Sequence, residues 1–121
     1  MIKKAIIYFL IAFMLGAAAY AAACMRTVKA KAGNSFSIKI ESNPTTGYSW
    51  QLASPVYGKL VRHVSNKYYP AKTGLVGSGG VEIWTFKAIK RGNTRIKFKY
   101  VRPWEKGIAP VSMRDICVKV Y

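Results

Sequence analysis

The feature that most constrains the fold is a two-residue alternation of apolar and polar side chains, which returns in short runs along most of the chain. In "TRIKFKYV" (residues 94–101) the apolar positions are Ile96, Phe98 and Tyr100, and arginine or lysine occupies the positions between them. Successive side chains of a β-strand point to opposite faces, so this pattern is typical of strands with one buried and one solvated face. No run after residue 23 shows the 3.6-residue stripe of an amphipathic helix. The sequence therefore predicts an all-β domain.

Other runs alternate in the same way and are separated by turn residues. They are "SFSIKIES" (35–42), "YSWQLAS" (48–54), "VEIWTFKAI" (81–89) and "ICVKV" (116–120), with a less regular strand expected in "KLVRHVSNKYY" (59–69). Between two of these runs, "KRGN" (90–93) predicts a tight hairpin. About seven short strands in roughly 100 residues predict an immunoglobulin-like antiparallel β-sandwich, in which Trp50 is buried.

Residues 1–23 are predicted to be a signal peptide, which leaves residues 24–121 as the folded domain. Two lysines near the start precede an uncharged apolar segment, and small residues follow it up to the predicted cleavage point. The uncharged span also approaches the ~20 residues of a membrane-spanning helix, so a retained anchor is the alternative. We expect an exported protein, either periplasmic or extracellular.

The two cysteines, Cys24 and Cys117, leave two outcomes open. In an oxidising compartment they are able to form a disulfide. Cleavage after residue 23 would instead make Cys24 the first residue, and "AAAC" (21–24) loosely matches a bacterial lipobox, so lipidation of Cys24 would attach the chain to a membrane. Two cysteines at this distance lack the spacing of a zinc site, and we expect no metal and no cofactor.

The charge of the predicted domain is strongly positive. Residues 24–121 contain 18 lysines and arginines and four acidic residues, a formal net charge of +14. Such a charge favours acidic partners but says nothing about the fold. Arg95, Lys97 and Lys99 form a basic stripe on one strand, so one reading of the function is a basic exported module that binds nucleic acid or an anionic surface polymer.

Enzymatic chemistry finds little support in these residues. The single histidine, His63, has no acidic neighbour in its strand, and no local feature brings it to a cysteine, as a Cys–His nucleophile requires. Four acidic residues make a paired-carboxylate hydrolase a poor fit. The glycines at 77–80 are followed by Val81 and Glu82, whereas a phosphate-binding loop needs Lys and Ser or Thr there. We expect a protein that is not an enzyme.

Three segments carry more glycine, proline and aromatic residues than a turn requires. They are "NPTTGY" (43–48), "KTGLVGSGG" (72–80) and "RPWEKGIAP" (102–110). Loops from alternate strand junctions of a sandwich gather at one end, so the three segments are predicted to form a single surface.

In this order and spacing, "NPTTGY", "GSGG" (77–80) and "RPWE" (102–105) resemble the chagasin family of cysteine-peptidase inhibitors. The flanking "WTFKA" and "FKYVRPWE" add to the resemblance, which extends from about residue 28 to residue 121. It implies a monomeric immunoglobulin-like sandwich whose three loops enter the active-site cleft of papain-like cysteine peptidases as a wedge. Inhibition would be reversible and non-covalent.

The resemblance also implies which residues bind the peptidase. Residues 43–47 would cover its catalytic cysteine and histidine, and residues 77–80 and 102–104 would contact the walls of its cleft. The expected binding residues are Asn43, Pro44, Thr45, Thr46, Gly47, Gly77, Ser78, Gly79, Gly80, Arg102, Pro103 and Trp104.

Individual residue types suit these roles. Pro44 restricts the backbone of its loop, which lowers the entropy lost on binding. Asn43 is expected to hold the turn through a hydrogen bond to its own backbone. Trp104 is the expected hot spot, or alternatively packs beneath its loop. Arg102 is expected to contact the peptidase or to form a surface ion pair with Glu105.

Overall fold

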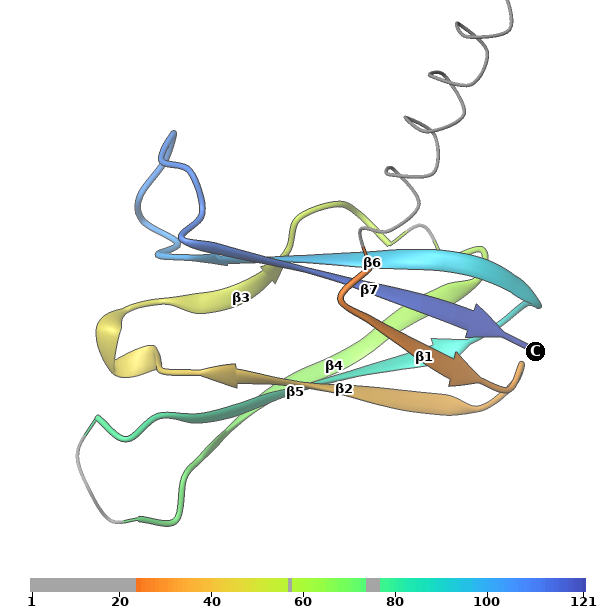
Figure 1. Cartoon of the computed structure of the whole chain (residues 1–121), viewed down its shortest axis with the longest axis horizontal. Coiled ribbons are helices and arrows are strands. Elements are labelled where there is room, and N and C mark those ends of the chain that lie inside the picture. The colour runs from red at the N-terminus through yellow and green to blue at the C-terminus, as the bar shows by residue number, and fades with distance from the viewer. Residues whose placement is uncertain (1–23, 57, 74–76) are drawn as a thin grey trace, which may run out of the picture.

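The computed structural model describes residues 24–56, 58–73 and 77–121 (Figure 1). Its strands are β1 (Arg26–Ala30), β2 (Ser35–Ser42), β3 (Ser49–Leu52), β4 (Val61–Pro70), β5 (Gly80–Ala88), β6 (Gly92–Val101) and β7 (Ser112–Val120), and a 3₁₀ helix, η1 (Pro44–Thr46), lies between β2 and β3. These ranges contain no α-helix, which confirms the all-β prediction, and no helix in them is long and apolar enough to cross a membrane. The predicted signal peptide, residues 1–23, lies outside the described residues.

The strands form two sheets that face each other as a sandwich (Figure 1). One sheet has the order β1-β7-β6-β3, and the other has the order β2-β5-β4. Neighbouring strands are antiparallel except β1, which runs parallel to β7. The sandwich architecture predicted from the alternation is confirmed.

The segment 90–93 does not close a hairpin, so that prediction is wrong. Strand β5 belongs to the three-stranded sheet and β6 to the four-stranded sheet, and the segment therefore carries the chain from one layer to the other. The backbone N–H groups of Ile89 and Lys90 donate to the carbonyl oxygen of Leu60, at 2.8 and 3.4 Å, which holds the start of this crossing. Alternation reveals which face of a strand is buried, but it does not reveal the sheet to which the strand belongs.

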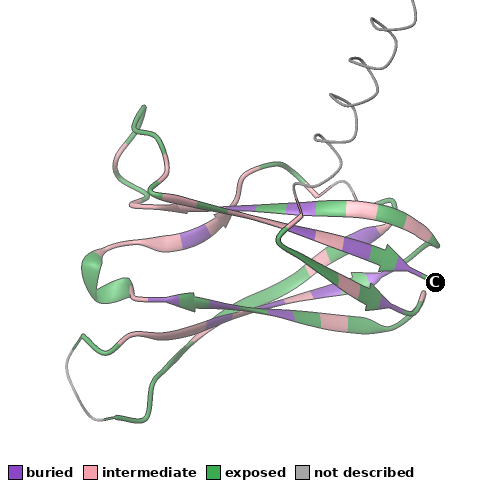
Figure 2. Cartoon of the chain, in the orientation of Figure 1, coloured by how far each residue is buried: buried purple, intermediate pink, exposed green. Residues whose placement is uncertain are grey.

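The apolar positions of the alternating runs form the core (Figure 2). Ile38, Phe86 and Phe98 are completely buried, and the ring of Trp84 meets that of Phe98 edge-on with a centroid distance of 5.1 Å. Trp50 is buried as predicted. Removing one such side chain from water contributes about 1.5–3 kcal/mol to folding stability, so these residues supply most of the free energy that holds the two sheets together.

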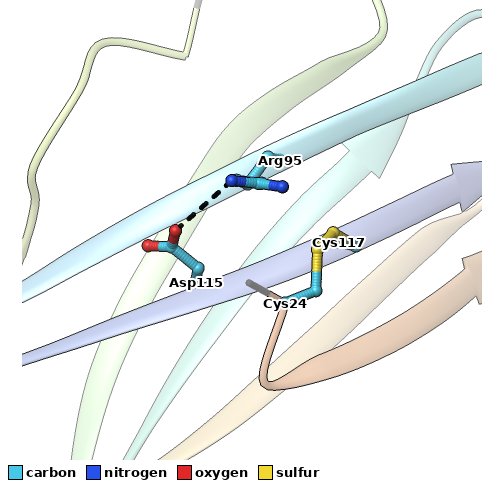
Figure 3. Close-up of a disulfide and its surroundings, with 4 residues drawn as sticks. All are labelled: Cys24, Arg95, Asp115 and Cys117. Carbon is cyan, nitrogen blue, oxygen red and sulfur yellow. Dashed lines mark ion pairs between the residues drawn. A yellow bond between two sulfur atoms is a disulfide. The ribbon is translucent and has the colours of Figure 1, made fainter. Parts of the chain in front are cut away.

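A disulfide joins Cys24 to Cys117 and ties the chain before β1 to strand β7 (Figure 3). It resolves the pairing that the sequence left open. Beside it, Arg95 of β6 and Asp115 of the neighbouring strand β7 form an ion pair at 3.6 Å.

One buried carboxylate links the two sheets near the end where β2 finishes. Glu82 of β5 is 6% exposed, and its carboxylate accepts hydrogen bonds from the backbone N–H of Trp50 at 3.1 Å and from Nε1 of Trp84 at 3.2 Å. Trp50 lies on β3, the edge strand of the other sheet. Glu82 therefore fixes that edge strand against the three-stranded sheet.

Candidate functional site

The three predicted loop segments lie side by side at one end of the sandwich (Figure 1). They connect β2 to β3, β4 to β5 and β6 to β7. We call them the NPTTG loop (residues 43–47), the glycine loop (residues 77–80) and the RPWE loop (residues 102–105). The prediction that these distant segments form one surface is confirmed.

The NPTTG loop is held by hydrogen bonds within its own five residues. The carbonyl oxygen of Asn43 accepts from the backbone N–H of Thr46 at 3.2 Å and from its hydroxyl at 2.7 Å. The Asn43 side-chain oxygen accepts from the hydroxyl of Thr45 at 2.5 Å. Gly47 ends the short helix with φ of 85°, a left-handed conformation that favours glycine. These bonds fix the shape of the loop before any partner arrives.

Asn43 also anchors the loop to its surroundings. Its backbone N–H donates to the hydroxyl of Tyr100 at 2.8 Å, and its side-chain Nδ2 donates to the carbonyl oxygen of Gly77 at 3.0 Å. The predicted bond from the Asn43 side chain to its own backbone is absent from the described structure, because the amide serves Thr45 and Gly77 instead. The sequence predicted Tyr100 only as an inward-facing residue; its place just before the RPWE loop was the one signal of a further role.

The glycine loop approaches its neighbours too closely for larger residues. A Cβ atom on Gly80 would lie 2.1 Å from the carbonyl oxygen of Tyr69, and one on Gly79 would lie 3.1 Å from that of Ser42. Gly79 also has a φ of 76°. Gly79 therefore brings the β4–β5 connection against Asn43 of the NPTTG loop, and Gly80 allows β5 to begin close to the end of β4. The hydroxyls of Thr73 and Ser78 form a hydrogen bond across this connection at 2.8 Å.

Arg102 joins the RPWE loop to the NPTTG loop. Its Nε donates to the carbonyl oxygen of Thr46 at 3.1 Å, and its Nη1 forms an ion pair with Glu105 at the same distance. The guanidinium also lies 4.5 Å from the ring centroid of Tyr48. The predicted pairing with Glu105 is confirmed, and the bond to Thr46 shows that Arg102 braces two loops.

Trp104 lies on the surface of this end of the molecule. The residue is 66% exposed, and the far edge of its ring lies against Gly47, where an added Cβ would come within 2.4 Å of Cη2. Trp104 therefore does not pack beneath its loop. A large aromatic side chain exposed on a braced loop is typical of a residue that contributes strongly to protein binding.

The arrangement offers a shaped surface rather than reacting groups. The ring of His63 lies tilted against that of Trp84 with a centroid distance of 5.1 Å, and the sulfur of Cys117 is in the disulfide. Across the described ranges, no group of three His, Cys, Asp or Glu residues is placed to hold a metal ion. What the three loops present is fixed backbone, threonine hydroxyls and one exposed indole.

Comparisons with known proteins agree with this picture. Residues 29–118 match the model of the chagasin family peptidase inhibitor I42. The chain is 36% identical over 74 residues to amoebiasin-2 of Entamoeba histolytica, a match that covers 61% of this chain and only 60% of amoebiasin-2. It is 32% identical over 83 residues to chagasin of Trypanosoma cruzi, which covers 64% of this chain and 74% of chagasin.

A solved structure gives the same result. The chain superposes on the crystal structure of EhICP2, a cysteine protease inhibitor from Entamoeba histolytica, with a TM-score of 0.64 and 30% identity over 79% of this chain and 86% of that one. These similarities give no support to the alternative of a basic module for nucleic acid or an anionic polymer.

Proposed function

The chain belongs to the chagasin family of peptidase inhibitors, and we propose that it inhibits papain-like cysteine peptidases reversibly and without a covalent bond. The observation that carries this proposal is the bracing of the three loops. Asn43 bonds the NPTTG loop to the glycine loop, and Arg102 bonds it to the RPWE loop. A surface assembled in advance loses little entropy on binding, which is the property that an inhibitor acting by occlusion needs.

The loops have distinct roles in this proposal. The NPTTG loop covers the catalytic cysteine and histidine of the peptidase, while the glycine loop and the RPWE loop contact the two walls of the cleft. Trp104 contacts the peptidase directly because most of its ring is free. Arg102 acts chiefly by positioning the NPTTG loop, since its guanidinium already bonds Thr46 and Glu105.

The positive charge has a use in the same function. A net charge of +14 on residues 24–121 would steer the inhibitor toward an acidic cleft and raise the association rate at low ionic strength. An association rate that stays constant from low to high salt would contradict this role of the charge.

Titration of papain with the protein tests the proposed function. We expect loss of peptidase activity at a one-to-one ratio and full recovery on dilution. Trp104→Ala should raise Ki about 30-fold, the equivalent of about 2 kcal/mol. Val64→Ala is the matched control, because Val64 is also exposed but lies on β4, outside the three loops. Papain activity that is unaffected by the wild-type protein would refute the proposal.

We also propose that the chain acts outside the cytoplasm, after removal of residues 1–23. The Cys24–Cys117 disulfide supports this, because such bonds persist in oxidising compartments. The same bond uses the sulfur that lipidation would need, so it favours a free protein over a lipoprotein. Mass spectrometry of the exported protein should show a chain that begins at Cys24 and carries a disulfide; a diacylglycerol adduct would contradict this proposal.

The fold type and the oligomeric state complete the proposal. The division into sheets of four and three strands supports an immunoglobulin-like sandwich of the constant type, although the parallel β1–β7 pair departs from it. The protein is proposed to act as a monomer, because one chain supplies all three loops. Sedimentation of the free protein and of its complex with papain would test this.

A further inference from the structure

The interior of the sandwich becomes polar at the end that carries the loops. Along β2, the inward positions Ile38 and Ile40 are followed by Ser42. Along β7, Arg114 stands at the inward position that precedes Ile116. A cation facing the space between two sheets loses hydration, so an anionic partner there would be favourable.

A groove opens between the sheets at this position. Its volume is about 730 Å³, and its lining includes Trp50, Tyr100 and Arg114 from the four-stranded sheet and Ser42 from the other sheet. Asn43, Ser78 and Gly79 also line it, so its mouth adjoins the NPTTG and glycine loops. A peptidase that binds these loops would therefore cover the groove.

Two hydrogen-bond donors in the groove lack acceptors within the described part of the chain. Ser42 is 6% exposed, and its buried hydroxyl has no hydrogen-bond partner there. The guanidinium of Arg114 lies 5.8 Å from the ring centroid of Trp50 and forms no ion pair with a described acidic side chain. Glu41 also lines the groove, but its residue is exposed to solvent and it forms no ion pair with Arg114.

We propose that this groove receives an acidic side chain of the bound peptidase. The carboxylate would accept two hydrogen bonds from the fork of Arg114, with the Trp50 ring as one wall. The proposal rests on the proposed function, because continuity with the loops is what identifies the peptidase as the source of the carboxylate. Arg114 would then help to determine which peptidases bind tightly.

Kinetics with papain test the proposal. Arg114→Gln should raise Ki about tenfold, mostly through faster dissociation, because it removes one partner of a desolvated charge pair. Arg62→Gln is the matched control, because it removes the same charge from an exposed position on β4, opposite Lys87 in the register with β5. Ki should change less than twofold in this variant. Thermal unfolding of both variants verifies that they fold. Equal effects of the two substitutions on Ki would overturn the proposal.

A second measurement examines the groove without a peptidase. The peptides acetyl-Gly-Glu-Gly-amide and acetyl-Gly-Gln-Gly-amide are titrated into the protein while NMR follows the Arg114 Nε–H and the Trp50 amide. Only the glutamate peptide should shift these signals, and Arg114→Gln should abolish the shift. Shifts spread evenly over surface lysines and arginines, or equal shifts with both peptides, would show that the groove does not select a carboxylate.

The two measurements separate this inference from the proposed function. If wild-type protein leaves papain active, the proposed function fails, and with it the peptidase as the source, whatever the peptides show. If papain is inhibited normally and Arg114→Gln inhibits as well as wild type, only the inference about the groove fails.

Discussion

At Gly47, a single added methyl group should weaken both folding stability and peptidase binding, and a control variant distinguishes the two effects. Its φ of 85° is left-handed, and a Cβ atom there would lie 2.4 Å from Cη2 of Trp104 and 3.1 Å from Cζ2. Gly47→Ala therefore has two consequences. The backbone is strained, and the ring of Trp104 must leave its place against the NPTTG loop.

The magnitudes of these two consequences follow from the surroundings. Alanine in a left-handed conformation loses roughly 1–2 kcal/mol of folding stability. For a domain of this size, that lowers Tm by about 4–8 °C for each kcal/mol. The ring itself is free to swing, because Trp104 is 66% exposed and its far edge makes the contact. We expect the displaced ring to raise Ki about 30-fold, as loss of a binding hot spot does.

Gly33→Ala is the matched control for the backbone strain. Gly33 lies in the turn between β1 and β2, at the other end of β2 from the NPTTG loop, and has a similar φ of 92°. No atom lies within 4 Å of the Cβ that it would gain. Gly33→Ala should therefore lower Tm by a similar amount and leave inhibition of papain unchanged.

Three measurements on both variants test this reasoning: Tm, Ki for papain, and the position of the Trp104 indole N–H signal by NMR. Gly47→Ala should change all three, whereas Gly33→Ala should change only Tm. The reasoning is refuted if the Trp104 signal moves in Gly47→Ala and Ki stays at the wild-type value. It is equally refuted if both variants raise Ki alike, since strain alone would then explain the effect.

Further perturbations probe the supports beneath the loops. Tyr100→Phe removes the acceptor for the backbone N–H of Asn43 and should lower the free energy of unfolding by about 1 kcal/mol. Tyr48→Phe is the control, because its hydroxyl has no described hydrogen bond, and it should leave the free energy of unfolding unchanged. Equal urea midpoints for the two variants would contradict a stabilising role of the Tyr100 hydroxyl. Glu82→Gln replaces one of two accepting oxygens by a donor and should lower the free energy of unfolding, measured in urea, by about 2 kcal/mol. An unchanged urea midpoint would show that the buried carboxylate does not contribute to folding stability. The Cys24–Cys117 disulfide joins residues that are 93 positions apart, so its reduction should lower the free energy of unfolding by about 2–4 kcal/mol. Ki should change little, because the bond lies away from the loops. A large rise in Ki would contradict that expectation.

Much of the fold follows from local pattern, because burial repeats along a strand with a fixed period. The alternation in residues 94–101 correctly placed Ile96 and Phe98 in the core. What the pattern omits is which strands are neighbours. For that reason the pattern predicts a hairpin at 90–93, where the chain crosses between the sheets, and it does not predict the parallel pairing of β1 with β7.

The candidate site shows the same division between local and distant information. The motifs located all three loops, and their shared position followed from the sandwich. The bonds that brace them join residues 34 to 57 positions apart, such as Asn43 with Gly77 and with Tyr100, and no local pattern encodes such partners. Arg114 was missed for a related reason: its inward position is evident only when the register of Ile116 is extended back into a polar segment.

The direction of β7 determines how this protein can be attached to other objects. The strand begins beside the loops at Ser112 and runs nine residues, about 30 Å, to the opposite end of the sandwich (Figure 1). Tyr121 therefore lies far from the three loops. A tag, a fluorophore or a bead linked at Tyr121 would leave the three loops open to solvent, so immobilised protein should bind the proposed peptidase partner as readily as protein in solution.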